Sequence, residues 1–344
     1  MNTKPFGKTG LYFPSIIFGS SALGNLFQAY SKADKKAILK EAFNRTSPNT
    51  VFDTAGKYGA GLALEVLGEF LAEERIPRSN VIITNKLGWT RVPLTTPEPQ
   101  FEPNIWKGIH HDAVQKISYE GILECFEKDN ALLQGYVPQL ISLHDPDEFL
   151  AKAKTKEERA LLWEELIGAI TAMKELKEAG KVNGVGVGAK DWKTTREIYS
   201  RVPLDYVMVA NSLSLIHHPP ELMDFLELLR KDNVGIIIAA IFQSGFLTGE
   251  DYFDYKKLNS SDPEDQMKIQ WRTAFFEVCQ KYDVAPFHAC IQFSLMVPGV
   301  SSVALSVNKP ELVEKNILAS ETSLPKEFWK ELKDKSLISD FPYL

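Results

Sequence analysis

Eight short apolar segments, each followed by a stretch with helical periodicity, constrain the fold of this 344-residue chain more than any other feature. Most of these segments are apolar at every position, which is typical of strands buried on both faces of a parallel sheet. Eight strand-then-helix units in one chain predict an α/β fold, the (β/α)8 TIM barrel. We expect its strands at residues 15–19, 50–53, 81–85, 139–143, 184–188, 206–210, 235–240 and 302–305.

Helix-start and helix-stop residues separate the expected strands. Ser31 with Asp34 has the pattern of a capping box, Pro220 suits a first helical turn, and Gly180 can end a helix. No Gly/Ser-rich linker or shift in composition interrupts the chain, so we expect a single barrel domain over residues 1–344. Residues 5–14 precede the first strand and predict a β-hairpin that plugs the bottom of the barrel.

Two insertions account for the length of the chain, since such barrels usually need about 250 residues. The first, residues 89–108, is proline-rich and lies between the third strand and its helix. The second, residues 243–266, follows the seventh strand. Both lie on the face where barrel active sites form, so they are either lids over a substrate or plain surface loops.

Charge and composition exclude several classes of partner. Acidic residues outnumber basic ones by 45 to 39, and a net charge of −6 disfavours nucleic acid and anionic membranes. The longest apolar run, residues 234–242, is about half of a membrane span, and residues 1–10 lack the apolar core of a secretory signal. The three cysteines are scattered. We expect a cytoplasmic protein with a small-molecule partner, and we leave the oligomeric state open.

Several glycine and histidine motifs do not carry chemistry. Residues 7–9 resemble the end of a phosphate-binding loop but lack its first glycine. The glycines at 184, 186 and 188 lie within a strand, so they predict close approach of a neighbour and not a dinucleotide fingerprint. The histidine pairs at 110–111 and 217–218 cannot share one helical face, and we expect solvated loop histidines and no metal site.

Ionisable residues gather where three consecutive strands end. Asp53, Lys86 and His144 lie at the ends of the second, third and fourth strands, and Tyr58 lies five residues after Asp53. The carboxyl ends of barrel strands meet at one mouth, so we expect these side chains to converge there.

This set of residue types suits acid–base chemistry at a tyrosine. A phenol has an ordinary pKa of about 10, and an ammonium beside it favours the phenolate. A carboxylate behind the lysine keeps it charged, and an imidazole can hydrogen-bond a substrate oxygen. Such a site interconverts alcohols and carbonyls, with hydride handled by a nicotinamide. The alternative is a structural Asp53–Lys86 pair and a Tyr58 that packs on Trp89.

The sequence resembles the aldo-keto reductase superfamily over nearly its whole length. The resemblance lies in residues 7–11 (GKTGL), 52–55 (FDTA) with 58–59 (YG), 84–86 (TNK) and 143–144 (LH). It implies a (β/α)8 barrel, a nicotinamide coenzyme bound without a Rossmann domain, and a catalytic tetrad of Asp53, Tyr58, Lys86 and His144.

Residues 210–213, 218–222 and 244–253 resemble the L-fucose or D-threo-aldose 1-dehydrogenase branch of this superfamily. The branch implies oxidation of the anomeric hydroxyl of a free aldose to a lactone, with L-fucose, L-galactose and D-arabinose as candidate substrates. Trp89 and Trp106 either stack on the sugar or pack onto the barrel rim.

The resemblance also implies a set of coenzyme contacts, namely Gly188, Asn211, Ser244, Gly245, Leu247, Ser306, Asn308, Lys309 and Asn316. Two positions depart from the family pattern: Gly188-Ala189 replaces a Ser-Asn pair, and Ala239 replaces an aromatic residue. Lys309 suits the extra phosphate of NADP, but an arginine often seen nearby is missing, so NAD is slightly favoured over NADP.

Two other functions remain open at this point. One is an NADPH-dependent aldehyde and ketone reductase of broad specificity. The other is a non-catalytic binding subunit, which the intact tetrad disfavours.

Overall fold

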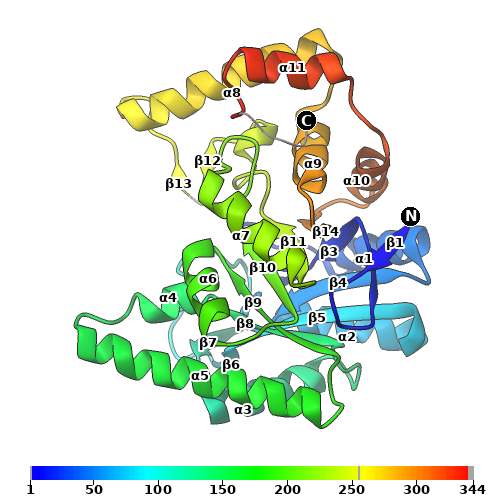
Figure 1. The fold of residues 1–344 in the computed structure, drawn as a ribbon. Helices are drawn as coiled ribbons and strands as arrows, with labels where there is room; N and C mark the ends of the chain where they lie inside the picture. Colours follow the sequence, from blue (N-terminus) through cyan, green and yellow to red (C-terminus); the bar gives the residue numbers. More distant parts are fainter. Residues whose placement is uncertain (1, 255, 340–344) are drawn as a thin grey trace.

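Eight parallel strands close into a barrel at the centre of the molecule (Figure 1). The computed structural model describes residues 2–254 and 256–339. The barrel strands are β3 (Ile16–Gly19), β4 (Thr50–Ala55), β5 (Val81–Leu87), β8 (Leu140–His144), β9 (Gly184–Ala189), β10 (Tyr206–Ala210), β11 (Gly235–Ala239) and β14 (Val300–Ser306). The last strand pairs with the first, Val303 opposite Ile16, which completes the barrel. All eight predicted strands are confirmed, and β4 and β5 continue past the predicted ends.

Helices surround the barrel on its outside (Figure 1). They are α1 (Lys32–Thr46), α2 (Leu62–Glu73), α3 (Tyr119–Leu132), α4 (Pro146–Leu150), α5 (Lys156–Glu178), α6 (Trp192–Arg201), α7 (Pro220–Lys231), α8 (Pro263–Lys281), α9 (Pro286–Met296), α10 (Glu311–Glu321) and α11 (Lys326–Asp334), with short 3-10 turns η1 (Ser21–Gly24), η2 (Arg78–Asn80) and η3 (Phe246–Thr248). The predicted helix boundaries are confirmed: the Ser31 hydroxyl accepts from the Asp34 N–H, Pro220 begins α7, and Gly180 follows α5 with φ +69°.

An N-terminal hairpin closes the bottom of the barrel, as predicted. Strands β1 (Thr3–Pro5) and β2 (Tyr12–Pro14) pair antiparallel. Phe6 lies between the two strands and Phe13 lies in β2. Their rings stack with centroids 4.0 Å apart, and both side chains are fully buried. They pack against residues inside the barrel, among them Tyr206. The lower half of the barrel is therefore filled with apolar side chains.

The strand glycines of β9 serve close packing inside the barrel. A Cβ on Gly186 would lie 2.6 Å from the Tyr206 ring, and a Cβ on Gly188 would lie 3.1 Å from Cδ of Lys86. This confirms the interpretation that these glycines admit neighbouring side chains.

Both insertions form short antiparallel pairs, and their bounds differ from those predicted. The first contains β6 (Trp89–Pro93) and β7 (His111–Gln115), so it extends beyond residue 108. Its far strand has no clear signal in the sequence, because the two strands are separated by an irregular segment without a tight-turn motif. The second contains β12 (Tyr252–Phe253) and β13 (Lys256–Lys257) and ends before 266, since the Asp262 carboxylate caps α8.

The interpretation of the histidine pairs is wrong for His218. His110 and His217 are exposed, and His111 is half-buried in β7. His218 Nδ1 lies 3.2 Å from the Ser214 carbonyl oxygen, and its Nε2 accepts a hydrogen bond from the Ser339 N–H at 3.1 Å. The C-terminal segment therefore folds back onto this loop. The two residues are 121 positions apart, so no local sequence pattern predicts this contact.

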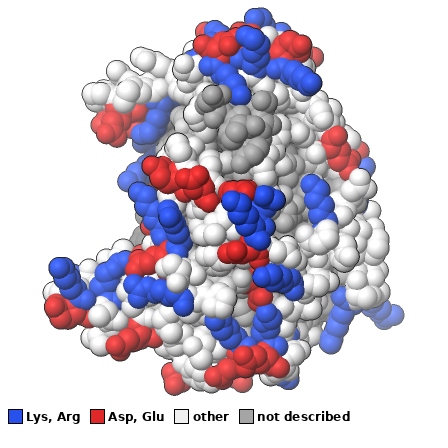
Figure 2. Space-filling model, in the orientation of Figure 1, with Lys and Arg blue, Asp and Glu red and all other residues white. Residues whose placement is uncertain are grey.

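Positive and negative side chains are interspersed on the face drawn in Figure 2. In the described part of the chain, no helix is both long enough and apolar enough to cross a membrane.

Candidate active site

Asp53 and Lys86 form a buried ion pair at the upper end of two neighbouring strands. Strand register places Ala55 of β4 opposite Lys86 of β5, and the Lys86 Nζ lies 2.5 Å from Asp53 Oδ2. Lys86 also donates to the Thr54 carbonyl oxygen at 3.2 Å, and the Thr84 hydroxyl donates to Asp53 Oδ1 at 2.7 Å. The carboxylate is thereby satisfied on both oxygens, and the ammonium is held in one place.

Tyr58 contacts both Lys86 of this pair and His144. The Lys86 Nζ is 4.9 Å from the centre of the Tyr58 ring, and the rings of Tyr58 and His144 meet edge to face at 5.7 Å. The predicted convergence of the four side chains at one mouth is confirmed.

Two glycines bring the turn that carries Tyr58 close to the barrel. Gly59 has φ +62°, and a Cβ there would lie 2.3 Å from the Gly24 carbonyl oxygen. A Cβ on Gly24 would lie 2.7 Å from the carbonyl carbon of Tyr58. The turn and η1 are thus in backbone contact, which leaves Tyr58 little freedom to shift.

His144 is held in its neutral form. Burial, followed by the positive charges of Lys86 and Lys57, lowers the pKa of His144 well below its ordinary value. Its Nδ1 finds no hydrogen-bond partner within residues 2–254 and 256–339. A neutral imidazole has one N–H donor, which suits a hydrogen bond to an uncharged substrate oxygen.

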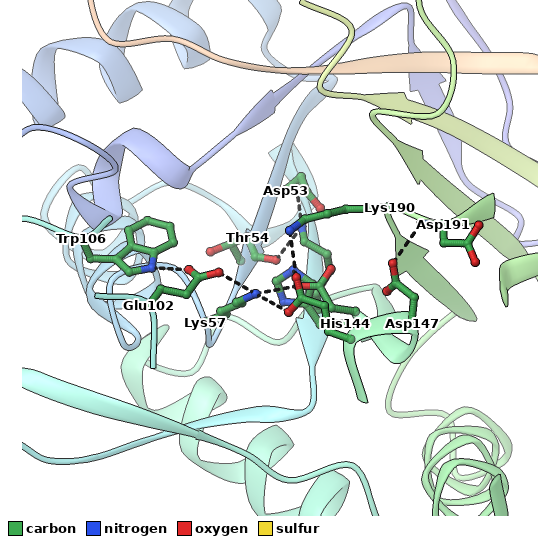
Figure 3. Close-up of polar contacts among 12 residues, drawn as sticks. Asp53, Thr54, Lys57, Glu102, Trp106, His144, Asp147, Lys190 and Asp191 are labelled. Atoms are coloured by element: carbon green, nitrogen blue, oxygen red, sulfur yellow. Dashed lines mark hydrogen bonds and ion pairs between the residues drawn. The ribbon is translucent and has the colours of Figure 1, made fainter. Parts of the chain in front are cut away.

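Sequence reasoning missed a second buried cluster beside His144, centred on Lys57 (Figure 3). The Lys57 Nζ lies 2.8 Å from Asp145 Oδ2, 3.0 Å from Glu148 Oε2 and 2.9 Å from Glu102 Oε1. Burial disfavours the ammonium, but Asp145, Glu102 and Glu148 outweigh it and raise the pKa of Lys57. The one available signal in the sequence is that Lys57 directly precedes Tyr58, the expected acid–base residue.

A buried carboxyl group also lies behind the site. Asp129 of α3 accepts a hydrogen bond from the Asn85 side chain at 2.8 Å, and burial raises the pKa of Asp129 to about 7. Its carboxyl group lies between α3, β5 and the turn after β4, where a Cβ on Gly56 would be 3.2 Å from Asp129 Oδ1.

Trp89 and Trp106 both lie in a buried aromatic cluster of the first insertion. Trp89 is 7% exposed, with the Lys57 Nζ 4.9 Å from its ring centre and Phe101 against it. This agrees with rim packing, one of the two alternatives. Trp106 stacks on Phe101 and lies 5.8 Å from the Tyr58 ring, centre to centre.

The candidate contacts for a nicotinamide ring lie on β9, β10 and the turn after β11. Gly188 packs on the Lys86 stem, and Ala239 is small and half-buried at the end of β11. Asn211 has φ +57°, and its buried Oδ1 has no partner among the described residues. Ser244 and Gly245 are half-buried at positive φ.

The remaining expected contact in this turn is Leu247. Leu247 lies in η3, and its side chain is fully buried in the hydrophobic core. Burial of this side chain leaves the backbone of Leu247 for contact with a coenzyme, and this contact stays a prediction.

The candidate phosphate and adenine contacts lie between β14 and α10. Ser306 is exposed, and its hydroxyl accepts hydrogen bonds from the Ser21 hydroxyl at 2.9 Å and the Ala22 N–H at 3.3 Å. Asn308 and Lys309 are exposed just before α10, and Asn316 is buried on α10. An exposed helix N-terminus favours phosphate, and the orphaned Asn211 oxygen favours a carboxamide. These residues fit a nicotinamide dinucleotide.

No group of three or more His, Cys, Asp or Glu side chains is placed to hold a metal ion within the described ranges.

Comparisons with known proteins agree with this geometry. The chain matches the Aldo/keto reductase family over residues 15–336. It is 29% identical to pyridoxal 4-dehydrogenase from Microbacterium luteolum, with 98% of each chain covered. It is 26% identical to D-threo-aldose 1-dehydrogenase from a Pseudomonas species, with 96% of each covered, and 25% identical to L-galactose dehydrogenase from Arabidopsis thaliana, with 92% of this chain and 87% of the relative covered.

Solved structures share the fold. An aldo-keto reductase from Bacillus halodurans superposes with a TM-score of 0.72 at 19% identity, covering 99% of this chain and 97% of the other. A glycerol dehydrogenase from Gluconobacter oxydans gives a TM-score of 0.72 at 17% identity, covering 96% and 94%. The chain therefore belongs to the aldo/keto reductase family, a family of oxidoreductases that use a nicotinamide coenzyme.

Proposed function

We propose that this protein oxidises the hemiacetal carbon of a free aldose to the lactone, with NAD as the coenzyme. The observation that carries the proposal is that the Tyr58 ring lies against both Lys86, which is paired with Asp53, and His144. The branch is supported by relatives named D-threo-aldose 1-dehydrogenase and L-galactose dehydrogenase.

The four side chains have distinct roles in this proposal. Tyr58, as phenolate, removes the proton from the C1 hydroxyl, and Lys86 stabilises the phenolate by its charge. Asp53 keeps Lys86 charged and aimed, while His144 donates a hydrogen bond to the substrate oxygen. When bound, the coenzyme supplies the acceptor for the hydride that leaves C1.

Residues of the upper barrel would hold the coenzyme. In this proposal Asn211 holds the carboxamide, and Gly188, Ser244, Gly245 and the Leu247 backbone surround the ring. The proposed contacts of the phosphate and adenine end are Ser306, Asn308, Lys309 and Asn316. The segment 306–316 contains lysines but no arginine, which favours NAD over NADP.

A second substrate class is favoured by the relative named pyridoxal 4-dehydrogenase. The 4-aldehyde of pyridoxal closes on the neighbouring 5-hydroxymethyl group to give a cyclic hemiacetal. An aldose ring and this pyridoxal ring therefore offer Tyr58 the same group, a hydroxyl on a carbon that becomes a lactone carbonyl.

Initial rates of coenzyme reduction test the proposal, with L-fucose, L-galactose, D-arabinose and pyridoxal each assayed with NAD and with NADP. Saturable reduction of NAD by a sugar supports it, and reduction by pyridoxal alone moves the substrate class. NADPH-dependent loss of simple aldehydes, without oxidation of any hemiacetal, overturns it in favour of a carbonyl reductase. Coenzyme binding without any turnover would indicate a binding subunit.

The role of Tyr58 is tested by Tyr58→Phe. A positioned proton-transfer group contributes about 10²–10⁴-fold, so kcat should fall by that factor while the Kd for the coenzyme stays unchanged. Tyr136→Phe is the matched control, because the Tyr136 hydroxyl donates to the Leu71 and Ile76 carbonyl oxygens, away from the tetrad. This variant should lose stability and keep its kcat.

A further inference from the structure

Lys57 is a buried ammonium that joins three separate parts of the chain. It is 3% exposed, and its partners come from the start of α4 (Asp145 and Glu148) and from the first insertion (Glu102). A buried charge of this kind persists only when it is paired, and loss of one partner leaves the others uncompensated.

One of these partners also faces the active-site imidazole. Asp145 Oδ2, which lies 2.8 Å from the Lys57 Nζ, lies 3.5 Å from His144 Nε2. The ammonium and the imidazole thus approach the same carboxylate oxygen. While Lys57 is present, the negative charge of Asp145 is balanced by it and does not stabilise a proton on His144.

Another partner leads to Tyr58. Glu102 accepts a hydrogen bond from the Trp106 Nε1 at 2.6 Å through its second oxygen, and the Trp106 ring packs against Tyr58. Figure 3 shows Trp106, Glu102 and Lys57 in a row that leads toward His144. A single ammonium therefore contacts the neighbours of two members of the tetrad.

We infer that Lys57 is a positioning residue: it neutralises Asp145 so that His144 stays an uncharged donor, and it ties the first insertion against Tyr58 through Glu102. The part concerning catalysis rests on the proposed function, in which His144 donates to a neutral substrate oxygen. The part concerning the charge of His144 stands on the geometry alone.

The sign of the effect follows from every charged group around His144. These groups are Lys86 from β5, Tyr58 and Lys57 from the turn after β4, Asp145 and Glu148 from the start of α4, and Lys190 after β9. Removal of Lys57 deletes a nearby positive charge and leaves Asp145 unbalanced. Both changes favour imidazolium, so His144 should be protonated at higher pH than in the wild type.

The test is a pH titration of His144 in the full-length Lys57→Met variant, followed by side-chain NMR of ¹⁵N-histidine protein, with His144→Gln used to assign the signal. We expect His144 of the variant to become protonated at a higher pH than His144 of the wild type. Since an opposite charge at this distance shifts a pKa by about 1–3 units, the acid limb of kcat/KM should move up by about one unit or more. An unchanged His144 signal in the variant overturns the inference.

Three further variants separate the effect of Lys57 on the charge of His144 from its effect on the first insertion. Lys57→Arg keeps the charge and should restore a neutral His144. Glu102→Gln keeps the Lys57–Asp145 pair, so it should leave His144 neutral while raising KM by loosening the insertion. The double variant Lys57→Met with Asp145→Asn removes both charges and should return His144 to neutrality. A double variant that titrates like the single one contradicts the role of Asp145. If the single variant folds poorly, protonation of His144 at a higher pH in Lys57→Arg than in the wild type contradicts the inference.

Lys177→Met is the control for loss of a paired lysine. Lys177 bonds both oxygens of Asp205 at 2.6 and 2.8 Å at the opposite end of the barrel. It should change neither the His144 titration nor the pH profile. Because the NMR readout needs no substrate, a failed substrate assignment and a failed role for Lys57 give different results.

Discussion

The Lys86 ammonium lies 2.5 Å from the Asp53 carboxylate, and the two side chains are only 3% and 4% exposed. Their meeting is set by strand register, since Asp53 lies opposite Thr84 and Lys86 lies opposite Ala55 on adjacent parallel strands. A two-residue diagonal across one sheet therefore places a fixed positive charge beneath the Tyr58 ring.

Removal of Lys86 should destabilise the protein more than removal of the whole pair. Lys86→Met leaves the buried Asp53 carboxylate without a partner, which lowers the free energy of unfolding by about 3–5 kcal/mol. The double variant with Asp53→Asn should recover most of this free energy. Both variants should lack activity. Urea unfolding at pH 7 measures the difference, with Lys32→Met as the control, because Lys32 pairs with Glu69 on the exposed surface. Equal unfolding midpoints for the single and double variants would contradict the prediction.

Asp129 should make the stability of the protein depend on pH between about 4 and 7. Burial raises its pKa to about 7 in the folded state, whereas an unfolded aspartate titrates near 3.9. In this window the folded state holds a proton that the unfolded state has lost, so the free energy of unfolding falls as pH rises. Above pH 7 the penalty is complete.

The variant Asp129→Asn isolates this effect. It should match the wild type near pH 4 and exceed its free energy of unfolding by roughly 2–4 kcal/mol at pH 8. Urea unfolding at both pH values measures this, and Asp334→Asn on the surface of α11 controls for the loss of one negative charge. A difference that does not change with pH would show that Asp129 is charged throughout.

Gly24→Ala should impair activity more than stability. The new Cβ would lie 2.7 Å from the Tyr58 carbonyl carbon, so the backbone that carries Tyr58 must move. A displacement of about 1 Å at a catalytic group costs on the order of 10²-fold in rate. We expect kcat/KM to fall by at least about tenfold, measured beside thermal unfolding.

Gly180→Ala is the matched control for this glycine. Gly180 has φ +69°, and a Cβ there would have no neighbour within 4 Å, so alanine costs roughly 1–2 kcal/mol of backbone strain and should leave kcat/KM unchanged. If Gly24→Ala behaved in the same way, Tyr58 would not depend on that contact.

Phe6→Ala should reduce stability without affecting the chemistry. Phe6 is fully buried and stacks on Phe13 at the bottom of the barrel, and truncation of such a ring costs about 3–5 kcal/mol. KM and kcat should stay at wild-type values at temperatures where the variant remains folded. Tyr12→Ala, on the exposed side of the same hairpin, should change neither quantity much, since Tyr12 is 58% exposed. A changed KM in Phe6→Ala would mean that the plug is coupled to the site.

The barrel strands and the convergence of Asp53, Lys86 and His144 were predictable because both depend on short-range signals. A strand buried on two faces is apolar throughout, and the polar residue that follows it marks the mouth. Lys57 was not predictable in this way. Its burial depends on carboxylates 45, 88 and 91 residues away, and the sequence around it reads as an ordinary polar turn.

The same limit explains the other misses. Strand β7 pairs with β6 across the irregular part of the insertion, so neither its partner nor its register follows from local periodicity. His218 accepts a hydrogen bond from the Ser339 N–H, a partner 121 residues away in the chain. In each case the deciding contact is long-range.

The hairpin that fills the lower barrel leaves the barrel closed at one end. Phe6 and Phe13 close the bottom of the barrel, so a molecule that reaches Tyr58 enters at the mouth and leaves by the same mouth. The first insertion borders this mouth, because its Trp106 packs on Tyr58. Sequence changes in the first insertion therefore affect the rate of substrate entry and the rate of product release together. Neither rate can be changed there without a change in the other.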